Sequence, residues 1–202
     1  MHQVVRILVG VLLACLSLNA WSKPGPIEIT PASTIQAHFE FWEDVTGAAS
    51  LEHVASPPDE RWSLVPEGRA TFGLTQSAYW LRFSVRNPTP IHQNLIAELA
   101  YSQLDDVVFH VLDDGVAVKT LRTGDSQAFY PRDVDYPSML LRVPLAPGEM
   151  KAVFVRIATS GSMVVPLMIW REQAFFESAA NELKLHFFYY GCIFVIESPQ
   201  VF

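Results

Sequence analysis

The stretch Tyr79–Asn87, which reads YWLRFSVRN, decides the fold class of this chain. Its residues alternate between an apolar set (Tyr79, Leu81, Phe83, Val85) and a more polar set (Trp80, Arg82, Ser84, Arg86). A period of two is typical of a β-strand with one buried face. Asn87-Pro88 ends the pattern, because proline has no N–H to donate to a neighbouring strand. The stretch predicts a central strand whose second face is either solvent-exposed or a shallow ligand site.

Short stretches rich in β-forming residues recur on both sides of this strand. They are Ala37–Trp42, Asn94–Tyr101, Asp105–Leu112, Val116–Leu121, Met139–Val143, Lys151–Ile157 and Val164–Trp170. Turn signals separate them, such as Asp113-Asp114-Gly115, where the glycine allows the positive φ of a tight hairpin. Strands at this spacing, with no long amphipathic helix among them, predict an all-β antiparallel β-sandwich of jelly-roll (galactose-binding-like) topology.

Between the first two predicted strands the sequence indicates little regular structure. Glu43–Gly47 is predicted to be a turn, and Ser50–Val54 a single helical turn with Ser50 as its N-cap. Prolines and charged residues dominate Ser56–Gly68, so a loop is predicted there.

Residues 1–22 have the composition of a secretory signal peptide. One arginine precedes the apolar run Ile7–Leu18, and Ala20-Trp21-Ser22 has the small-x-small pattern of a cleavage site. Leu12-Leu13-Ala14-Cys15 loosely resembles a lipobox, so a lipoprotein signal is the alternative. Residues 23–36 are expected to form an extended, proline-rich lead. No cysteine lies between Lys23 and Asn181, which excludes a cysteine nucleophile and a cysteine–metal site from that part of the exported chain.

Charge and motif content exclude several classes of function. The net charge is −7 and the 14 lysines and arginines are scattered, so nucleic acid is not an expected partner. The histidines have no paired ligand spacing, and phosphate-loop, dinucleotide and nucleophile-elbow motifs are absent. We therefore expect no metal, no cofactor and no enzymatic activity. A hydrolase remains the alternative, because two carboxylates that the fold brings together leave no sequence signature.

The candidate ligand-binding residues are aromatic and arginine side chains, which sugar and carboxylate sites use for stacking and for bidentate hydrogen bonds. They are Trp80, Arg82, Tyr101, Tyr130, Arg132 and Arg142, and Arg156 is of the same type. Arg132 lies in a predicted loop, where binding residues concentrate. The alternatives are core positions for the aromatics, solvated strand faces for the arginines, and a salt bridge from Arg132 to Asp133 or Asp135.

Asp105-Asp106 are not expected to form a catalytic pair or a calcium site, because adjacent residues on a strand point to opposite faces. They are expected to cap the start of the strand.

Several short motifs, each weak alone, occur in an order and at a spacing that together are specific. They are Glu43-Asp44-x-Thr46-Gly47, Tyr79–Phe83 with Asn87, Leu104-Asp105-Asp106-Val107, Tyr130-Pro131-Arg132, Pro137–Leu145 with Pro147-Gly148-Glu149, and Ser160-Gly161-Ser162 with Pro166-Leu167 and Trp170. The combination resembles the second type of extracellular domain of bacterial seven-transmembrane receptors with diverse intracellular signalling modules (7TMR-DISM). The resemblance implies a periplasmic sensory jelly-roll sandwich over residues 37–171, with a carbohydrate-like small molecule as its ligand.

The end of the chain changes character after the sandwich. Residues 172–184 predict an amphipathic linker helix, and Leu185–Ile196 is an almost uninterrupted aromatic and aliphatic run. A helix over that run would be about 18 Å long, against roughly 30 Å of hydrocarbon in a bilayer. The resemblance places Phe187–Gly191 at the start of the first transmembrane helix of the family. Residues 185–196 are thus interpreted as a truncated transmembrane helix, and residues 197–202 as an aberrant tail.

The expected function is periplasmic sensing of a small molecule, carbohydrate or carboxylate, with the bound state passed through the linker helix. The chain would be tethered to the inner membrane through Leu185–Ile196, and a second copy in a homodimer is a further expected partner. The alternative is a secreted carbohydrate-binding or assembly module with no signalling role.

Overall fold

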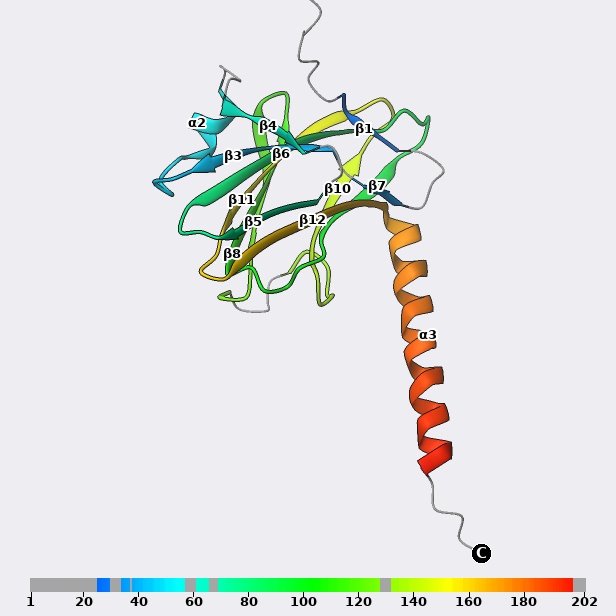
Figure 1. The fold of residues 1–202 in the computed structure, drawn as a ribbon. Coiled ribbons are helices and arrows are strands. Elements are labelled where there is room, and N and C mark those ends of the chain that lie inside the picture. Colours follow the sequence, from blue (N-terminus) through cyan, green and yellow to red (C-terminus); the bar gives the residue numbers. More distant parts are fainter. Residues whose placement is uncertain are drawn as a thin grey trace, which may run out of the picture.

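The structure is a computed structural model and describes residues 25–29, 34–36, 38–56, 61–65, 69–127 and 132–197, with the backbone alone for residues 34–36, 69 and 194–197. The predicted signal peptide and Tyr130 lie outside these ranges. Two β-sheets pack face to face, and a long helix leaves the sandwich at the end of the second sheet (Figure 1).

The seven-stranded sheet, sheet A, contains the strand predicted to be central. Its order is β4 (Ser63–Val65), β3 (Phe39–Asp44), β6 (Ala78–Arg86), β11 (Met150–Ala158), β8 (Asp106–Asp113) and β9 (Val116–Thr123). These neighbours are all antiparallel, and β1 (Ile27–Glu28) pairs in parallel with the end of β6. Strand β6 therefore has β3 and β1 along one edge and β11 along the other, which confirms its predicted central place.

The five-stranded sheet, sheet B, has the order β10 (Met139–Leu145), β7 (Gln93–Leu99), β12 (Ser162–Arg171) and β2 (Thr34–Gln36). Strand β5 (Arg69–Leu74) pairs with the other half of β12. From β5 to β12 the chain changes sheet at every connection except the β8–β9 hairpin. This alternation is the wrapping of an antiparallel jelly-roll sandwich, as the sequence predicted.

The main core lies between the two sheets and uses one face of β6. Tyr79, Leu81, Phe83 and Val85 are 6%, 0%, 6% and 1% exposed, which confirms the alternation read from the sequence. They share one apolar cluster with inward-facing residues of sheet B, including Leu95, Leu99, Leu141 and Leu167. Burial of this apolar surface supplies the main driving force for holding the sheets together.

Among the described residues, two helices flank the sheets. The short α2 (Leu51–Ala55) begins at Ser50, whose Oγ accepts a hydrogen bond from the His53 N–H at 3.3 Å, so the predicted cap is confirmed. Helix α3 (Glu172–Glu197) continues directly from β12 and projects away from the sandwich (Figure 1). The predicted linker helix and the apolar run are thus one continuous helix. Within the described part of the chain, no helix is both long enough and apolar enough to span a membrane.

Four strands were missed by the sequence prediction. β1 and β2 fall in the predicted extended lead, β4 falls in the predicted loop Ser56–Gly68, and β5 follows that loop. Each has two to six residues. Segments this short carry too little alternation to be recognised, and pairing with longer strands decides their conformation.

Asn87 joins the two sheets where β6 ends. Its side chain is fully buried, and Nδ2 donates to the carbonyl oxygens of Ile91, Leu145 and Ala146 at 2.8, 3.2 and 3.1 Å. Its Oδ1 accepts from the Thr89 N–H and hydroxyl. One amide therefore satisfies polar groups of both the β6–β7 loop and the β10–β11 turn.

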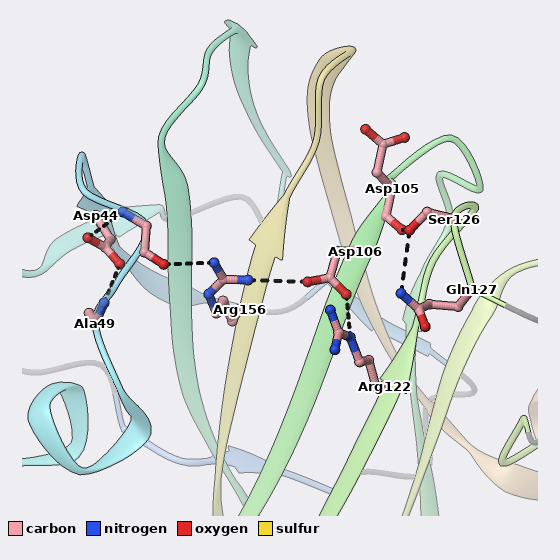
Figure 2. A network of polar contacts seen from close by, with 9 residues as sticks. Asp44, Ala49, Asp105, Asp106, Arg122, Ser126, Gln127 and Arg156 are labelled. Carbon is pink, nitrogen blue, oxygen red and sulfur yellow. Dashed lines mark hydrogen bonds and ion pairs between the residues drawn. The ribbon is translucent and has the colours of Figure 1, made fainter.

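A polar network closes one end of sheet A (Figure 2). Arg156 on β11 donates to the Gly47 carbonyl oxygen at 3.0 Å and to Asp106 Oδ2 at 3.3 Å. Asp106 also pairs with Arg122 Nε at 2.7 Å. The neighbouring Asp105 instead accepts from the N–H and hydroxyl of Ser160 at 2.6 and 2.8 Å. The two adjacent aspartates thus serve different partners, in agreement with the prediction that they do not converge on one site.

Asp44 fixes the turn after β3 at the same end of the sheet. Its carboxylate is almost fully buried and accepts hydrogen bonds from the Thr46 hydroxyl and from the N–H groups of Gly47 and Ala49. Burial alone would raise the pKa of Asp44, but these hydrogen bonds outweigh it, and the pKa is lowered from its usual value of 3.8. The turn is therefore stabilised by the ionised carboxylate.

We predict that Asn87→Ala lowers the free energy of unfolding by about 3 kcal/mol, because buried carbonyl groups lose their donor. Urea denaturation measures this change, and Asn87→Asp, which keeps the shape but loses the donating amide, should be destabilised too. A loss below about 0.5 kcal/mol for the alanine variant, typical of surface positions, would contradict the assigned role.

We predict that protonation of Asp44 accounts for part of the fall in the free energy of unfolding at acidic pH. Because its pKa is lower in the folded than in the unfolded state, its contribution is complete above about pH 4 and is lost as the pH falls through the folded value. Urea denaturation between pH 7 and pH 2 should show a shallower acid decline for Asp44→Asn than for the unsubstituted chain. The exposed Asp125→Asn variant is the control, and identical pH profiles for all three chains would rule out the contribution of Asp44.

Candidate functional site

The outer face of sheet A, which points away from sheet B, carries a row of side chains across five strands. Strand register places Glu40 opposite Arg82, Arg82 opposite Phe154, Phe154 opposite His110, and His110 opposite Thr120. Residues directly opposite each other in paired strands point to the same face of the sheet. The row therefore sets an acidic, a basic, an aromatic and two further polar side chains next to one another.

A second apolar cluster covers part of this outer face. It contains Val54 from α2, Trp62, Trp80 from β6, Leu112 from β8 and Phe154 from β11. Trp62 contacts the Phe154 ring edge-on, with ring centroids 6.1 Å apart. Strand β6 is therefore buried on both faces over part of its length.

Trp80 lies inside this cluster, which corrects its place among the predicted ligand-binding residues. The sequence left three alternatives for it, a ligand-stacking, a solvent-facing or a core position, and only 1% of it is exposed. Its ring stacks on the imidazole of His110 at 5.9 Å. The buried indole N–H has no hydrogen-bond partner among the described residues, a cost of about 1–3 kcal/mol that the surrounding packing must offset. Because the ring is covered, Trp80 supports the site without offering a face to a ligand.

Arg82 lines a hollow of about 240 Å³ beside this cluster, here called the first hollow. The hollow is lined by Gly25, His38, Glu40, Arg82, Phe83, Ser84, Ala152 and Phe154. Arg82 Nε donates to Glu40 Oε2 at 2.6 Å, and the guanidinium carbon lies 4.4 Å from the centroid of the Trp62 ring. The carboxylate and the indole thus hold the arginine head in one position.

The first hollow offers both donors and acceptors at its surface. About a sixth of the Arg82 and Glu40 side chains is exposed, and Ser84 adds a hydroxyl beside the apolar Phe154. Because Glu40 already neutralises Arg82, a free carboxylate would have to compete with Glu40 for the guanidinium. The surface is therefore better suited to a neutral molecule with several hydroxyl groups, each of which donates and accepts hydrogen bonds.

His110 extends the row away from the first hollow. Burial lowers the pKa of its imidazole, and Nδ1 lies 3.0 Å from the Thr120 hydroxyl oxygen. The ring is therefore neutral at pH 7 and adds polarity to this part of the face without adding charge.

Among the described residues, the predicted site residues Tyr101, Arg132 and Arg142 do not gather around Arg82. Tyr101 packs against the main core, and its hydroxyl donates to Gln103 Oε1. Arg132 Nη1 donates to the carbonyl oxygens of Tyr136 and Pro137 at 2.7 and 3.3 Å, within its own loop. Arg142 lies on sheet B, and Tyr130 falls outside the described residues. The fold therefore does not bring Tyr101, Arg132 and Arg142 together with Arg82 into one site.

Arg142 belongs instead to the attachment of α3. Its Nε pairs with Glu172 Oε1 at 2.6 Å, and Asn94 Nδ2 donates to the other oxygen of Glu172 at 2.6 Å. Phe175 is 3% exposed and packs edge-on against Tyr136 and Trp170. The first turn of α3 is thus fastened to the outer face of sheet B by charge and by apolar contact.

A second set of contacts links this attachment to sheet A. Asp133 Oδ2 accepts from Lys119 Nζ on β9 at 2.6 Å and from the Arg142 N–H on β10 at 2.5 Å. Lys119 Nζ also donates to the Arg142 carbonyl oxygen at 2.9 Å. The edge strands of the two sheets are therefore joined beside the point where α3 begins.

Sequence reasoning missed several residues of the first hollow. Glu40 had a usable signal, because an acidic residue alternates with aromatic ones in the predicted strand Ala37–Trp42. Phe154 sits on a correctly predicted strand, but the sequence does not show which face it occupies. Trp62 had no signal at all, because it lies in a predicted loop and reaches the site only through tertiary packing.

Comparisons with known proteins give one clear match. Residues 36–171 match the family model described as 7TMR-DISM extracellular 2. A search of curated proteins found no match.

Solved structures that resemble the chain do so distantly. TmCBM61 in complex with β-1,4-galactotriose has a TM-score of 0.31 and 9% identity, over 66% of this chain and 88% of that one. A family 35 carbohydrate-binding module from Clostridium thermocellum has a TM-score of 0.31 and 13% identity, over 69% and 99%. A β-glucosidase from Kluyveromyces marxianus has a TM-score of 0.35 and 10% identity, over 81% and 21%. Similarities this low do not establish a shared function.

Proposed function

The chain belongs to the 7TMR-DISM extracellular 2 family of extracellular sensor domains, and on this premise we propose that its sandwich binds a small neutral carbohydrate in the periplasm and reports binding through α3. The observation that carries the proposal is the first hollow, where Arg82 and Glu40 are held in one position beside Ser84 and Phe154. Fixed polar groups at the edge of an apolar cluster suit the alternating hydroxyl and C–H surfaces of a sugar.

The paired charges in the first hollow favour a neutral sugar over a carboxylate. Arg82 lies in the lining of the first hollow, and its Nε donates a hydrogen bond to Glu40 Oε2 at 2.6 Å. Displacing Glu40 would leave a partly buried carboxylate without its cation, which costs free energy. A sugar hydroxyl group can form a hydrogen bond with Arg82 or Glu40 while the ion pair between them stays intact.

We propose binding without turnover. Glycoside hydrolysis generally needs two carboxyl groups that flank the scissile bond. Among the described residues that line the first hollow, Glu40 is the only carboxylic acid, and it faces an arginine rather than a second acid. This arrangement supports recognition more than acid–base chemistry. Release of reducing sugar by the purified chain from any glycoside in a broad panel would overturn this part of the proposal.

The proposed output runs from sheet A to α3 through the edge strands. Lys119 adjoins the row residue Thr120 on β9, and Asp133 links Lys119 to the backbone of Arg142, whose side chain holds Glu172. A ligand that favours one arrangement of β9 would also favour one position of the first turn of α3. In the proposed receptor, Leu185–Ile196 lead toward the inner membrane and the ligand state passes along the helix.

We predict that Arg82→Gln weakens sugar binding by roughly tenfold to a hundredfold, because a charged donor is lost from the first hollow. Isothermal titration calorimetry with neutral sugars and sugar acids first identifies a ligand, and the variant is then titrated with it. Circular dichroism checks that the variant remains folded.

Arg86→Gln is the matched control. Arg86 lies on the same strand and also pairs with a glutamate, Glu28, but half of its side chain is exposed and it does not line the first hollow. Unchanged binding by Arg82→Gln, or equal losses in both variants, would remove Arg82 from the site.

We predict that Glu172→Gln loosens the first turn of α3, because the ion pair to Arg142 becomes a weaker neutral hydrogen bond. Hydrogen–deuterium exchange should show faster exchange at residues 173–178 and a smaller change when the ligand is added. Glu177→Gln, on an exposed turn of the same helix, is the control. Equal exchange in the two variants, with and without ligand, would contradict the proposed route.

A further inference from the structure

A second hollow, of about 520 Å³, lies where β3 ends and α2 begins. Its lining includes Trp42 and Asp44 from β3, His53 from α2, and Arg61. The site described above does not use it. Because it is concave and contains an aromatic ring with polar groups around it, it has the composition of a ligand-binding surface.

Three side chains define the second hollow. The Arg61 guanidinium carbon lies 5.2 Å from the centroid of the Trp42 ring, and the His53 ring centroid lies 5.8 Å from that of Trp42. Arg61 Nη1 is 3.0 Å from His53 Nε2. Arg61 and His53 are exposed and Trp42 is half-buried. The indole is therefore a fixed wall, and the two polar heads stand at its solvent edge.

The two hollows are neighbours on the same face of sheet A. Glu40 of the first hollow and Trp42 of the second are two residues apart on β3, so their side chains share a face at a separation of about 7 Å. Trp62 lies between them, because the Arg82 guanidinium sits over its ring and its centroid is 6.3 Å from that of Trp42. A molecule that extends past Trp62 would touch both hollows.

The second hollow has two acidic side chains, Glu43 and Asp44, and one arginine, Arg61, in its lining. Asp44 is occupied by three donors within its own turn, and Glu43 lies beside the hydroxyl of Tyr79, whose pKa is raised by burial and by that glutamate. Arg61 supplies the opposite charge at the rim. Like the first hollow, the second presents donors and acceptors together with an aromatic ring, without a strong excess of either charge.

We propose that the two hollows are successive subsites for one elongated neutral oligosaccharide, with the second subsite formed by Trp42, Arg61 and His53. This inference rests on the proposed function, because the first hollow must bind a sugar for the second to extend it. The ligand class is thereby a chain of two or more sugar units. A monosaccharide would occupy the first hollow and leave the second unfilled.

The test is a length series measured by calorimetry with the full chain. Cello-, xylo- and galacto-oligosaccharides of one to five units are titrated into the unsubstituted chain and into Arg61→Gln, Trp42→Phe and Arg122→Gln. Arg122, an exposed arginine on β9 of the same sheet, lines neither hollow and is the control. In one series affinity should rise about three- to tenfold once the chain is long enough for an added unit to reach Trp42.

In Arg61→Gln and Trp42→Phe this gain should disappear or shrink, while binding of the shorter sugars stays unchanged. Short sugars that bind as well as long ones would overturn the second subsite and leave the proposed function intact. Binding of none of these sugars would overturn both. A gain with length that survives in Arg61→Gln and Trp42→Phe would place the extra contacts elsewhere and also overturn the inference.

Discussion

Packing of aromatic rings on the outer face of sheet A is the interaction on which the candidate site depends. Strand β6 buries Tyr79, Leu81 and Phe83 against sheet B and buries Trp80 on its other face. The cluster around Trp80 holds Trp62 in place, and Trp62 supports the Arg82 guanidinium beside Glu40. Removing the cluster would release the long arginine side chain to solvent, where its head would lose a fixed position. The site is therefore a consequence of a strand that is buried on both sides.

The outer faces of the two sheets serve different purposes. Sheet A carries the hollows, and sheet B carries the attachment of α3 through Glu172 and Phe175. Polar contacts join the sheets at their margins, among them the Asn87 amide at the end of β6 and the contact of Lys119 with the Arg142 carbonyl oxygen on β10. In the proposed function, this division provides one surface for the ligand and another for the output helix, with polar contacts between them.

Much of the fold was predictable from the sequence, and less of the site. Alternation marked the long strands and the inward face of β6. The family motifs contain Asp44, Asn87 and Asp105, whose side chains form hydrogen bonds with backbone groups. Strands as short as β1 and β4 were missed because they form by pairing with longer strands, and their own sequences are too short to show alternation. Trp80 was grouped with the ligand-binding residues, with a core position as the alternative, because alternation shows which residues share a face but not whether another segment covers that face. Arg142 and Arg132 were grouped with Arg82 by residue type, yet they lie on sheet B and in the loop that adjoins it.

We propose that the outer face of sheet A recognises the ligand, and NMR can test this by mapping backbone amide chemical shifts during titration with a sugar that binds. The largest shift changes are expected on β3, β6 and β11 around Glu40, Arg82 and Phe154, with smaller changes at the first turn of α3. Changes confined to sheet B, or to the loops at the ends of the sandwich, would contradict it.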